Sequence, residues 1–442
     1  MKINNLIKIG KELFPICRSL TGRGNLKTLR ILKREIPNLK IKKIKSGTKV
    51  FDWKIPPQWD IFDAYIKDSS NNKIIDFKKN NLHLLGYSKP FNKTVIKENL
   101  LKNLFSLKKL PNAIPYVTSY YKKAWGFCLS HNMLRKFNLD YTDKHKFKVF
   151  INSKFKKNGH MHYAEYLIPG RSKKEILLST YICHPSMANN ELSGPLVALG
   201  LIRHFQKRKN NFSLRFIFIP ETIGSIAYIS KNFKQIKKNV LGGINLTCVG
   251  DERNFSLLTS KYNNSILDKA AKNVFKKDNI IYKKYSFLTR GSDERQFSSP
   301  GVDLPFISVM RTKYGKYPEY HTSLDTFDLV TSRGLSGSVT IIKKIIKSLL
   351  NHNVEKFYHK LDINKKLKHP KATIICEPFL TKRNMYPTIS RSVLDKVSRN
   401  YLNFIQYADG SNGINEISKL IKLDKLKTSN IYKDLKILKL VT

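Results

Sequence analysis

The stretch YICHPSMANNELSG, residues 181–194, is the point from which the fold can be worked out. It follows an apolar run over residues 175–182 that has the length of a buried strand, and a second apolar run from Pro195 begins a helix. His184 is therefore expected at the carboxyl end of a strand. In open α/β sheets ligands bind at that edge, so the polar loop after His184 predicts a site.

Outward from this stretch, strands and helices are expected to alternate along the chain. Such alternation predicts an α/β fold with a doubly wound, mostly parallel sheet covered by helices on both faces. The strands are expected at 175–182, 214–219, 242–249 and 304–310, and the helices at 193–208, 225–234, 264–275 and 333–350.

Two further regions differ from this core in their residue pattern. Short aromatic strands with turn signals fill residues 46–115 and indicate an inserted small β domain. After a connector with three prolines, three short helices and a closing Leu440-Val441 run indicate a winged-helix domain, which we expect to be separable. The expected helices are 393–406, 415–421 and 428–436, and the expected domains are 1–45 with 116–360, 46–115, and 365–442.

Composition limits the classes of function. With 82 Lys and Arg against 32 Asp and Glu, the net charge is +50, which would suit acidic partners, but the lysines are spread through nearly every segment rather than gathered in a patch. Five widely separated cysteines give neither a disulfide framework nor a CxxC metal motif. The chain shows no secretory signal and no apolar run of membrane-spanning length, so we expect a cytoplasmic protein.

Two common kinds of site are not predicted. Neither GxxxxGK[ST] nor GxGxxG occurs, so nucleotide binding is not indicated. Cys183 and His184 are adjacent at a strand end and should project to opposite faces, which argues against a cysteine nucleophile paired with a histidine base.

Polar side chains follow several of the expected strands at the same edge of the sheet. Glu221 follows one strand, Thr247 and Asp251 follow the next, and His321 comes after the strand at 304–310. Two histidines and a carboxylate from separate strand ends can form a zinc site with an open position. In such a site Glu221 would act as the base on bound water.

These residues carry a family resemblance. Over roughly 30–45 and 130–350 the chain resembles zinc aminopeptidases of the peptidase M28 type, in the His184 loop with NELSG (190–194), Glu221-Thr222, the SDE run (292–294) and the YHTSLD run (320–325). The whole chain resembles more closely the bacterial DUF4910 group, in which a DUF2172 β module is inserted and a winged helix ends the chain. The stretches PICRSLTG (15–22), CHPS (183–186), PETIGS (220–225) and GSDERQ (291–296) make that assignment specific.

The resemblance implies a metal-dependent hydrolase with aminopeptidase-type chemistry, associated with cell-surface polysaccharide biosynthesis or glycan modification. It also shows departures. Asn190 stands where a carboxylate bridges two metals, Thr222 and Thr247 replace two further acidic ligands, and Ser186 replaces the Asp that orients the first histidine. Without these charges two dications would repel, so at most one zinc ion is expected.

The resemblance and the charge argument together give a set of expected roles. His184 and His321 would hold the zinc with Glu191 or Asp251, although Glu191 could instead be a carboxylate at a helix N-terminus. An acidic group such as Asp293 or Glu294 would hold a substrate amine. The substrate-binding set is Asp293, Glu294, Asn190 and Tyr320.

Alternatives of other classes stay open. One is a catalytically silent binding or scaffold protein of the same fold. Another is a DNA-binding regulator that acts through residues 390–442, where Asp424 and Asp434 interrupt a lysine-rich segment. The expected substrate is small and peptide-like or amino-sugar-linked, the winged helix could take a protein or nucleic-acid partner, and the oligomeric state is open.

Overall fold

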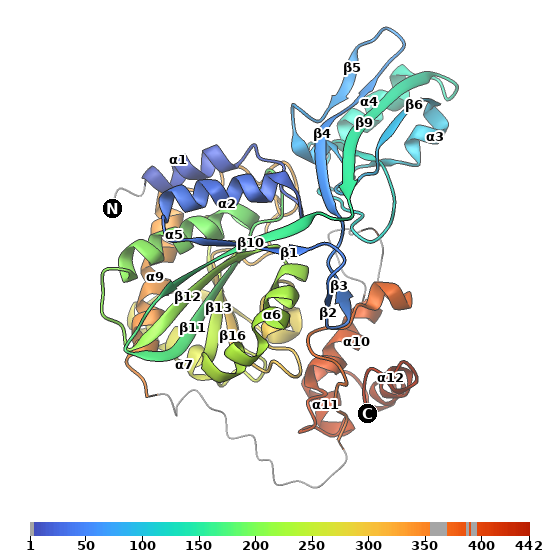
Figure 1. Cartoon of the computed structure of the whole chain (residues 1–442). Helices are drawn as coiled ribbons and strands as arrows, with labels where there is room; N and C mark the ends of the chain where they lie inside the picture. The colour runs from blue at the N-terminus through green and yellow to red at the C-terminus, as the bar shows by residue number, and fades with distance from the viewer. Residues whose placement is uncertain (1–3, 354–368, 386–388, 390–395) are drawn as a thin grey trace.

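An eight-stranded mixed sheet forms the centre of the molecule, seen in a computed structural model that describes residues 4–353, 369–385, 389 and 396–442 (Figure 1). Its four middle strands are parallel, and antiparallel pairs occur at β1–β10, β10–β12 and β14–β16. The α/β fold is confirmed. The strand order is β1 (Lys40–Lys45), β10 (His160–Ile168), β12 (Phe212–Ile219), β11 (Ser172–Tyr181), β13 (Val240–Asn245), β16 (Phe306–Met310), β14 (Phe255–Leu258) and β15 (Tyr282–Tyr285).

Helices cover both faces of this sheet because its strands are apolar on both sides. Along β11, Ile176 and Leu178 enter one core cluster while Leu177 enters the other, as the two-residue period of a strand requires. The first face is covered by α1 (Asn4–Leu13), α2 (Arg23–Glu35), α5 (Ser193–Phe205), α7 (Ile266–Lys277) and α9 (Ser332–Leu350), and the second by α6 (Ile223–Asn239) and α8 (Glu294–Phe297).

The expected strands and helices of the core lie within a few residues of the observed ones, but four strands of the sheet were not expected. β1, with sequence KIKKIK, and β15, with sequence YKKY, are edge strands with mostly exposed lysines. Such strands have no continuous apolar run, so a pattern of buried strands does not find them. β10 and β14 pair antiparallel to their neighbours, which strand–helix alternation does not anticipate.

The inserted β region is larger than residues 46–115. Its four-stranded sheet, at the upper right of Figure 1, has the order β5-β4-β9-β6, and β9 pairs with both β4 and β6. The expected boundary at residue 115 is therefore too early, because the longest strand of this sheet ends at Lys156. The region contains β2 (Lys49–Val50), β3 (Trp53–Lys54), β4 (Gln58–Lys67), β5 (Lys73–Asp76), β6 (Phe91–Ile96), α3 (Lys97–Leu101), β7 (Leu104–Phe105), β8 (Phe127–Cys128), α4 (His131–Asp140) and β9 (Lys146–Lys156).

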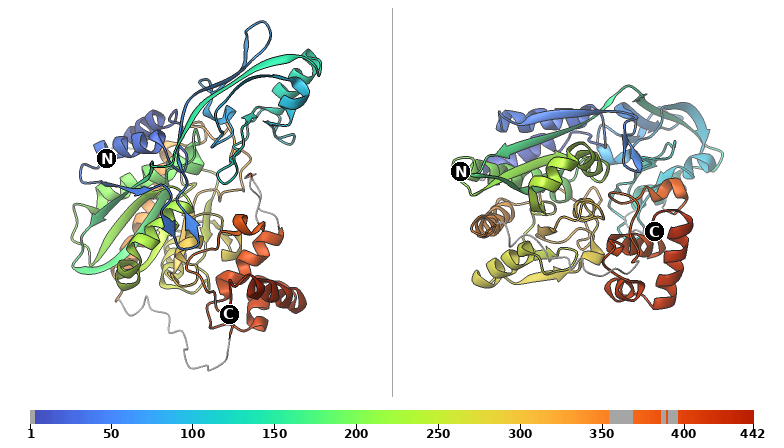
Figure 2. Two further views of the ribbon diagram at one scale, coloured as in Figure 1. Left: turned by 45° about the vertical axis from the view of Figure 1, so that its right-hand side comes forward. Right: turned by 60° about the horizontal axis from the view of Figure 1, so that its bottom comes forward.

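The C-terminal helices pack against the α/β domain, on the side of β2 and β3 (Figure 2). They are α10 (Lys396–Tyr407), α11 (Ile414–Ile421) and α12 (Lys425–Ile437); the expected start at residue 393 lies outside the described residues. Leu402 and Phe404 share one apolar cluster with Leu258 and Met310 from the main sheet. The C-terminal helices therefore pack on the main domain, and the expectation that they form a separable module stays a prediction.

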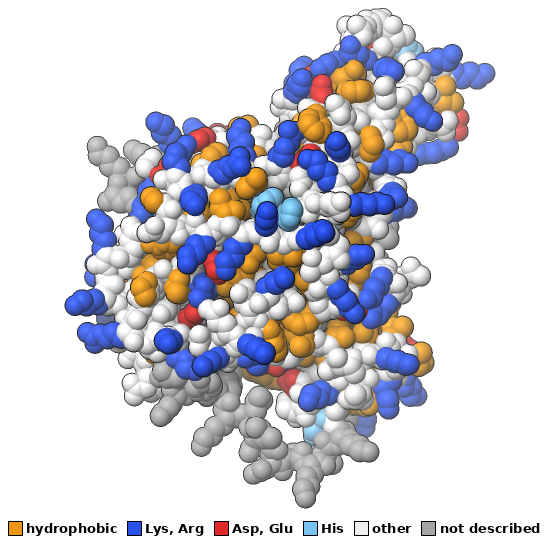
Figure 3. Space-filling model, in the orientation of Figure 1, with side chains coloured by type: hydrophobic (Ala, Val, Ile, Leu, Met, Phe, Trp, Pro, Cys, Tyr) orange, Lys and Arg blue, Asp and Glu red, His pale blue; other side chains and the backbone are white. Residues whose placement is uncertain are grey.

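Lys and Arg side chains are spread over the whole face seen in Figure 3. On this face the distribution agrees with a general compositional bias and does not single out one basic patch. Among the described residues, no helix is both long enough and apolar enough to cross a membrane.

Candidate functional site

A pocket of about 230 Å³ opens at the carboxyl edge of the central strands. His184 and Glu221 enter it from the loops that follow β11 and β12, and His321 enters it from the segment that follows β16. Aromatic side chains form much of its wall. The aromatic lining residues are Trp53, Tyr116, Tyr120, Tyr121 and Tyr320.

The structure brings three of the predicted residues together in this pocket. The ring centroids of His184 and His321 are 5.2 Å apart, and Nε2 of His184 lies 3.9 Å from Oε2 of Glu221. Tyr116 contacts both imidazoles, with centroid distances of 5.1 Å to His184 and 5.3 Å to His321. The two histidines are thus close enough to share one metal ion.

Glu221 reaches the pocket through an unusual turn. Thr222 has φ 63° and ψ −76°, and the amide of Ile223 donates to the Glu221 carbonyl at 2.8 Å, which together define a strained γ-turn. Asp293 accepts from the Thr222 amide at 2.8 Å, and Arg295 donates to the Thr222 hydroxyl at 2.6 Å. A β-branched residue at positive φ is uncommon, and neighbouring contacts must hold it there.

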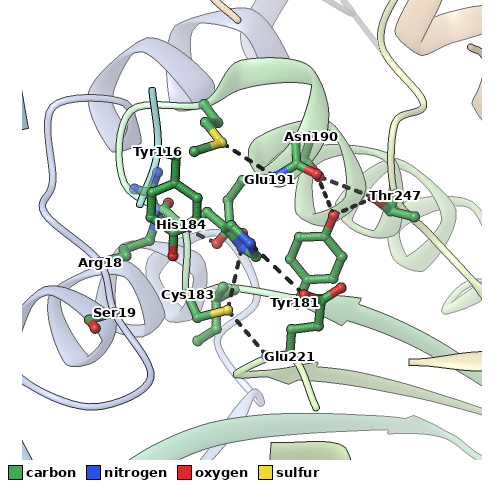
Figure 4. A network of polar contacts seen from close by, with 12 residues as sticks. Arg18, Ser19, Tyr116, Tyr181, Cys183, His184, Asn190, Glu191, Glu221 and Thr247 are labelled. Atoms are coloured by element: carbon green, nitrogen blue, oxygen red, sulfur yellow. Dashed lines mark hydrogen bonds and ion pairs between the residues drawn. The ribbon is translucent and has the colours of Figure 1, made fainter. Parts of the chain in front are cut away.

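Glu191 supports His184 from behind. Its Oε2 lies 2.9 Å from Nδ1 of His184, and its Oε1 lies 3.5 Å from Nε of the buried Arg18 (Figure 4). Arg18 also donates to the His184 carbonyl at 2.9 Å. Because Glu191 contacts both groups and does not line the pocket, it can hold the His184 ring in one orientation. Glu191 also belongs, with Cys183 and His184, to a group whose possible metal-ligand atoms lie within 4.8 Å of one another, so the ligand role expected for it stays a prediction.

The electrostatics of the pocket differ between its two histidines. Burial lowers the pKa of His184, but the hydrogen bond and the charge of Glu191 outweigh burial and raise it. Burial and the neighbouring His184 hold the pKa of His321 well below its usual value, so its imidazole is neutral, as a metal ligand must be. Burial raises the pKa of Glu221, and burial with the Glu221 charge raises that of Asp293 to about 8.

A neutral hydrogen-bond network stands where a second metal would need acidic ligands. The Tyr181 hydroxyl donates to Asn190 Oδ1 at 2.8 Å and lies 2.6 Å from the Thr247 hydroxyl (Figure 4). Thr247 donates in turn to the Asn190 carbonyl at 3.1 Å. These groups satisfy one another and bring no negative charge. The pocket thus offers the imidazoles of His184 and His321 as nitrogen donors, whereas this network adds no acidic ligand of the kind that a second dication needs.

The loop that carries Asn190 is held at both ends. It forms a π-helical turn (Ala188–Leu192) whose amides at Asn189 and Asn190 donate to the Asp325 carboxylate at 2.6 and 2.9 Å. Burial raises the pKa of Asp325 to about 6.

At Gly194 a side chain would lie 2.3 Å from the Leu246 carbonyl, so only glycine lets α5 start this close to the end of β13.

Two expected acidic site residues are instead structural. Asp251 accepts hydrogen bonds from Asn189, the Thr312 amide and the Thr312 hydroxyl, and it does not line the pocket. Glu294 accepts from the amides of Gly291 and Ser292 and from three side chains, among them the Tyr314 hydroxyl at 2.7 Å. The metal role expected for Asp251 and the amine-binding role expected for Glu294 are therefore corrected, because protein donors already occupy their oxygens.

The other members of the expected substrate-binding set lie at different depths. Tyr320 lines the pocket and stacks on His321, with ring centroids 3.9 Å apart. Asp293 and Asn190 are fully buried outside the pocket lining. One oxygen of Asp293 holds the Glu221 turn through the Thr222 amide and the Ser225 hydroxyl. Asp293 and Asn190 thus shape the loops of the site.

The argument from strand geometry about Cys183 is wrong. Its Sγ lies 3.4 Å from Nδ1 of His184, because the chain leaves the extended conformation at this point. Cys183 and His184 form a group with Glu191 whose possible ligand atoms all lie within 4.8 Å. Burial raises the thiol pKa well above its ordinary value, and Sγ accepts from the Glu221 amide at 3.2 Å. A buried thiol with a raised pKa is a poor nucleophile.

Arg18 and Asp325 were not among the expected site residues. Each lies inside a stretch that carried the family resemblance, Arg18 in PICRSLTG and Asp325 in YHTSLD. The resemblance was therefore the signal that could have identified them as site residues. Their positions are set by contacts across the chain: Arg18 meets a residue 166 positions away. No local pattern predicts such a contact.

Comparison with known proteins agrees with this fold. A polysaccharide biosynthesis protein with an aminopeptidase-like domain from Clostridium acetobutylicum is 41% identical over 388 residues, covering 88% of this chain and 83% of that protein. A crystal structure of a peptidase from the same organism aligns with TM-score 0.75 and 35% identity over 100% of this chain and 96% of that one. The zinc aminopeptidase of Bacillus subtilis shares the fold, with TM-score 0.60 and 12% identity over 79% of this chain and 94% of that one.

Two families match successive parts of the chain. Residues 368–442 match a winged helix-turn-helix family, in agreement with α10–α12 and the strand-like bridge between Ala372 and Val441. Residues 7–353 match the domain of unknown function DUF4910. The sheet, the pocket histidines and this match over most of the chain lead to one assignment: the chain belongs to the DUF4910 family.

Proposed function

We propose that the protein is an aminopeptidase-like amide hydrolase that uses a single zinc ion. The observation that carries the proposal is the convergence of His184, His321 and Glu221 in one pocket. The neutral network of Tyr181, Asn190 and Thr247 supports one ion rather than two.

In the proposed amide hydrolysis, the ion and the side chains have different roles. A zinc ion held by His184 and His321 would polarise a carbonyl and lower the pKa of a water molecule. Glu221 takes the proton of the attacking water and delivers it to the leaving amine. Burial raises the pKa of Glu221, against the opposing effects of His184 and Arg295, and so makes it a stronger base. Glu191 keeps His184 in one orientation throughout.

Elemental analysis after dialysis, combined with turnover of amino-acid anilides, tests this proposal. We expect one zinc per chain, lost in His184→Ala and in His321→Ala, whereas Glu221→Gln should retain zinc and lose hydrolysis. His145→Ala is a matched control, because His145 does not line the pocket. Two zinc ions per chain, or unchanged turnover in Glu221→Gln, would contradict the proposal.

The substrate and setting are part of the proposal. The name of the Clostridium relative supports a role in polysaccharide biosynthesis, and the aromatic pocket supports a small peptide-like or amino-sugar-linked amide. Five free thiols support a cytoplasmic location.

A catalytically silent binding protein is the second candidate, and the loss of acidic groups at Asn190, Thr222 and Thr247 favours it. It would bind the same amides without turnover and would not need zinc. Within the C-terminal helices, α12 exposes both lysines and the apolar Leu426 and Ile437, which supports a protein partner more than DNA. Retention on DNA that disappears at moderate salt would indicate only nonspecific binding.

A further inference from the structure

The C-terminal part of the chain forms one wall of the pocket. Glu377, Pro378, Leu380 and Thr381 line it, and so does Leu402 from α10. The histidines and Glu221 line the same pocket from the α/β domain. A site of about 230 Å³ is small for a ligand pocket, so each wall residue matters for what fits.

The first four wall residues belong to residues 377–383, which we call the strap. The strap is fastened to the β2–β3 hairpin. The indole of Trp53 donates to the Glu377 carbonyl at 2.7 Å and stacks on Phe379 with ring centroids 4.5 Å apart. Asp52 accepts from the Phe379 amide at 2.7 Å and from Arg383 at 2.6 Å. The strap is thus held from its first residue to its last.

A second set of contacts joins the strap to α8 and α10. The buried Glu377 carboxylate accepts from the side-chain amides of Gln296 at 2.9 Å and Gln406 at 3.1 Å. Nε of Arg295 lies 3.4 Å from the same carboxylate, and Arg295 also binds the Thr222 hydroxyl in the Glu221 turn. The strap therefore connects, through one arginine, to the backbone that presents Glu221.

We propose that the strap determines substrate specificity, with Leu380 and Thr381 limiting the pocket to a single terminal amide-bearing unit and excluding internal segments of a polymer. This inference deepens the proposed hydrolase and rests on it where turnover is the readout. Leu380 is buried in the wall, so shortening its side chain enlarges the pocket and lengthening it fills the pocket.

Specificity is tested with the p-nitroanilides of alanine, leucine and tryptophan. We expect Leu380→Ala to raise the kcat/KM ratio of the tryptophan to the alanine substrate by about tenfold, on the scale of a few methylene groups in an apolar pocket. Leu380→Trp should shift the ratio in the opposite direction. Leu435→Ala is the matched control, because Leu435 is equally buried in the C-terminal helices and does not line the pocket.

A second measurement needs no turnover. In the full-length protein, Asp52→Asn should speed amide hydrogen exchange in residues 377–383, because the Phe379 amide loses a charged acceptor. Tryptophan amide should slow exchange in these residues in the wild type and not in Leu380→Trp.

The two readouts separate the two claims. Absence of turnover with slowed exchange would overturn the hydrolase and support the strap as a wall of a binding pocket. Turnover with an unchanged substrate ratio in both Leu380 variants would overturn the strap proposal. So would the absence of any effect of tryptophan amide on exchange.

Discussion

Nδ1 of His184 and Oε2 of Glu191 lie 2.9 Å apart, and both side chains are buried. This contact fixes which ring nitrogen of His184 faces the pocket, since a histidine held at Nδ1 by a carboxylate presents Nε2. Its Nε2 is the atom that lies 3.9 Å from Glu221.

Glu191→Gln should therefore weaken zinc binding by about 10–100-fold, the usual effect of losing a carboxylate behind a metal-binding histidine. A competition titration with a zinc chelator measures the change in Kd. Glu98→Gln, at an exposed position on α3, is the control. An unchanged Kd would show that Glu191 does not orient His184 for a metal.

The neutral network predicts how a second ion could be introduced. Replacing both Asn190 and Thr247 by aspartate adds two negative charges beside Tyr181. We expect elemental analysis to give one zinc per chain in the wild type and two in the double variant, because charge compensation is what two neighbouring dications require. A double variant that still holds one zinc would show that charge is not the limiting factor.

Arg215 predicts a large loss of stability far from the pocket. It donates to Glu175 at 2.5 and 2.9 Å and to Glu165 at 3.1 Å, and all three side chains are buried. Arg215→Met takes the shared cation away from two buried carboxylates, although Glu165 keeps its ion pair with Lys42 and Glu175 keeps a hydrogen bond from Gln235. The free energy of unfolding should therefore fall by about 3 kcal/mol in urea titrations.

An exposed ion pair provides the comparison for Arg215. Arg333 lies 3.0 Å from Glu252 and its side chain is 88% exposed. Arg333→Met should change the free energy of unfolding by less than about 1 kcal/mol. Equal effects of the two substitutions would contradict the assignment of Arg215 to a buried network.

Because of Asp52, the free energy of unfolding should depend on pH in the acidic range. Burial acts to raise the pKa of Asp52, but hydrogen bonds from Arg383 and Lys382 outweigh it and hold the pKa below its ordinary value. The unfolded chain then takes up the proton first as the pH falls, so this stabilisation is present above about pH 4 and is lost as the pH falls through the folded pKa.

Urea titrations of the wild type and Asp52→Asn across pH measure this effect. We expect the wild type to be more stable by about 1.5–3 kcal/mol at neutral pH, as for hydrogen bonds to charged groups. The difference should shrink below about pH 4. A difference that does not vary with pH would mean that the Asp52 charge is not what fastens the strap.

The sequence was sufficient to predict the central strands of the sheet but not its edge strands. Apolar runs such as residues 214–219 predict buried strands, whereas KIKKIK in β1 forms a strand because β10 offers it a partner. In the site, residues that end strands were predictable because topology gathers them at one edge. The partners of Glu191 and Asp251 were not, because their hydrogen bonds depend on side-chain positions that no spacing encodes.

The bond from Trp53 to Glu377 joins residues 324 positions apart, and it has a consequence for how the protein is made. Such distant contacts form late, because the chain between them must be synthesised and its ends brought together first. The pocket histidines can assemble on the ribosome before the strap has emerged, yet the wall opposite them is complete only after α10 has been synthesised. A nascent or truncated chain would therefore present an open pocket, and selectivity would be acquired only near the end of translation.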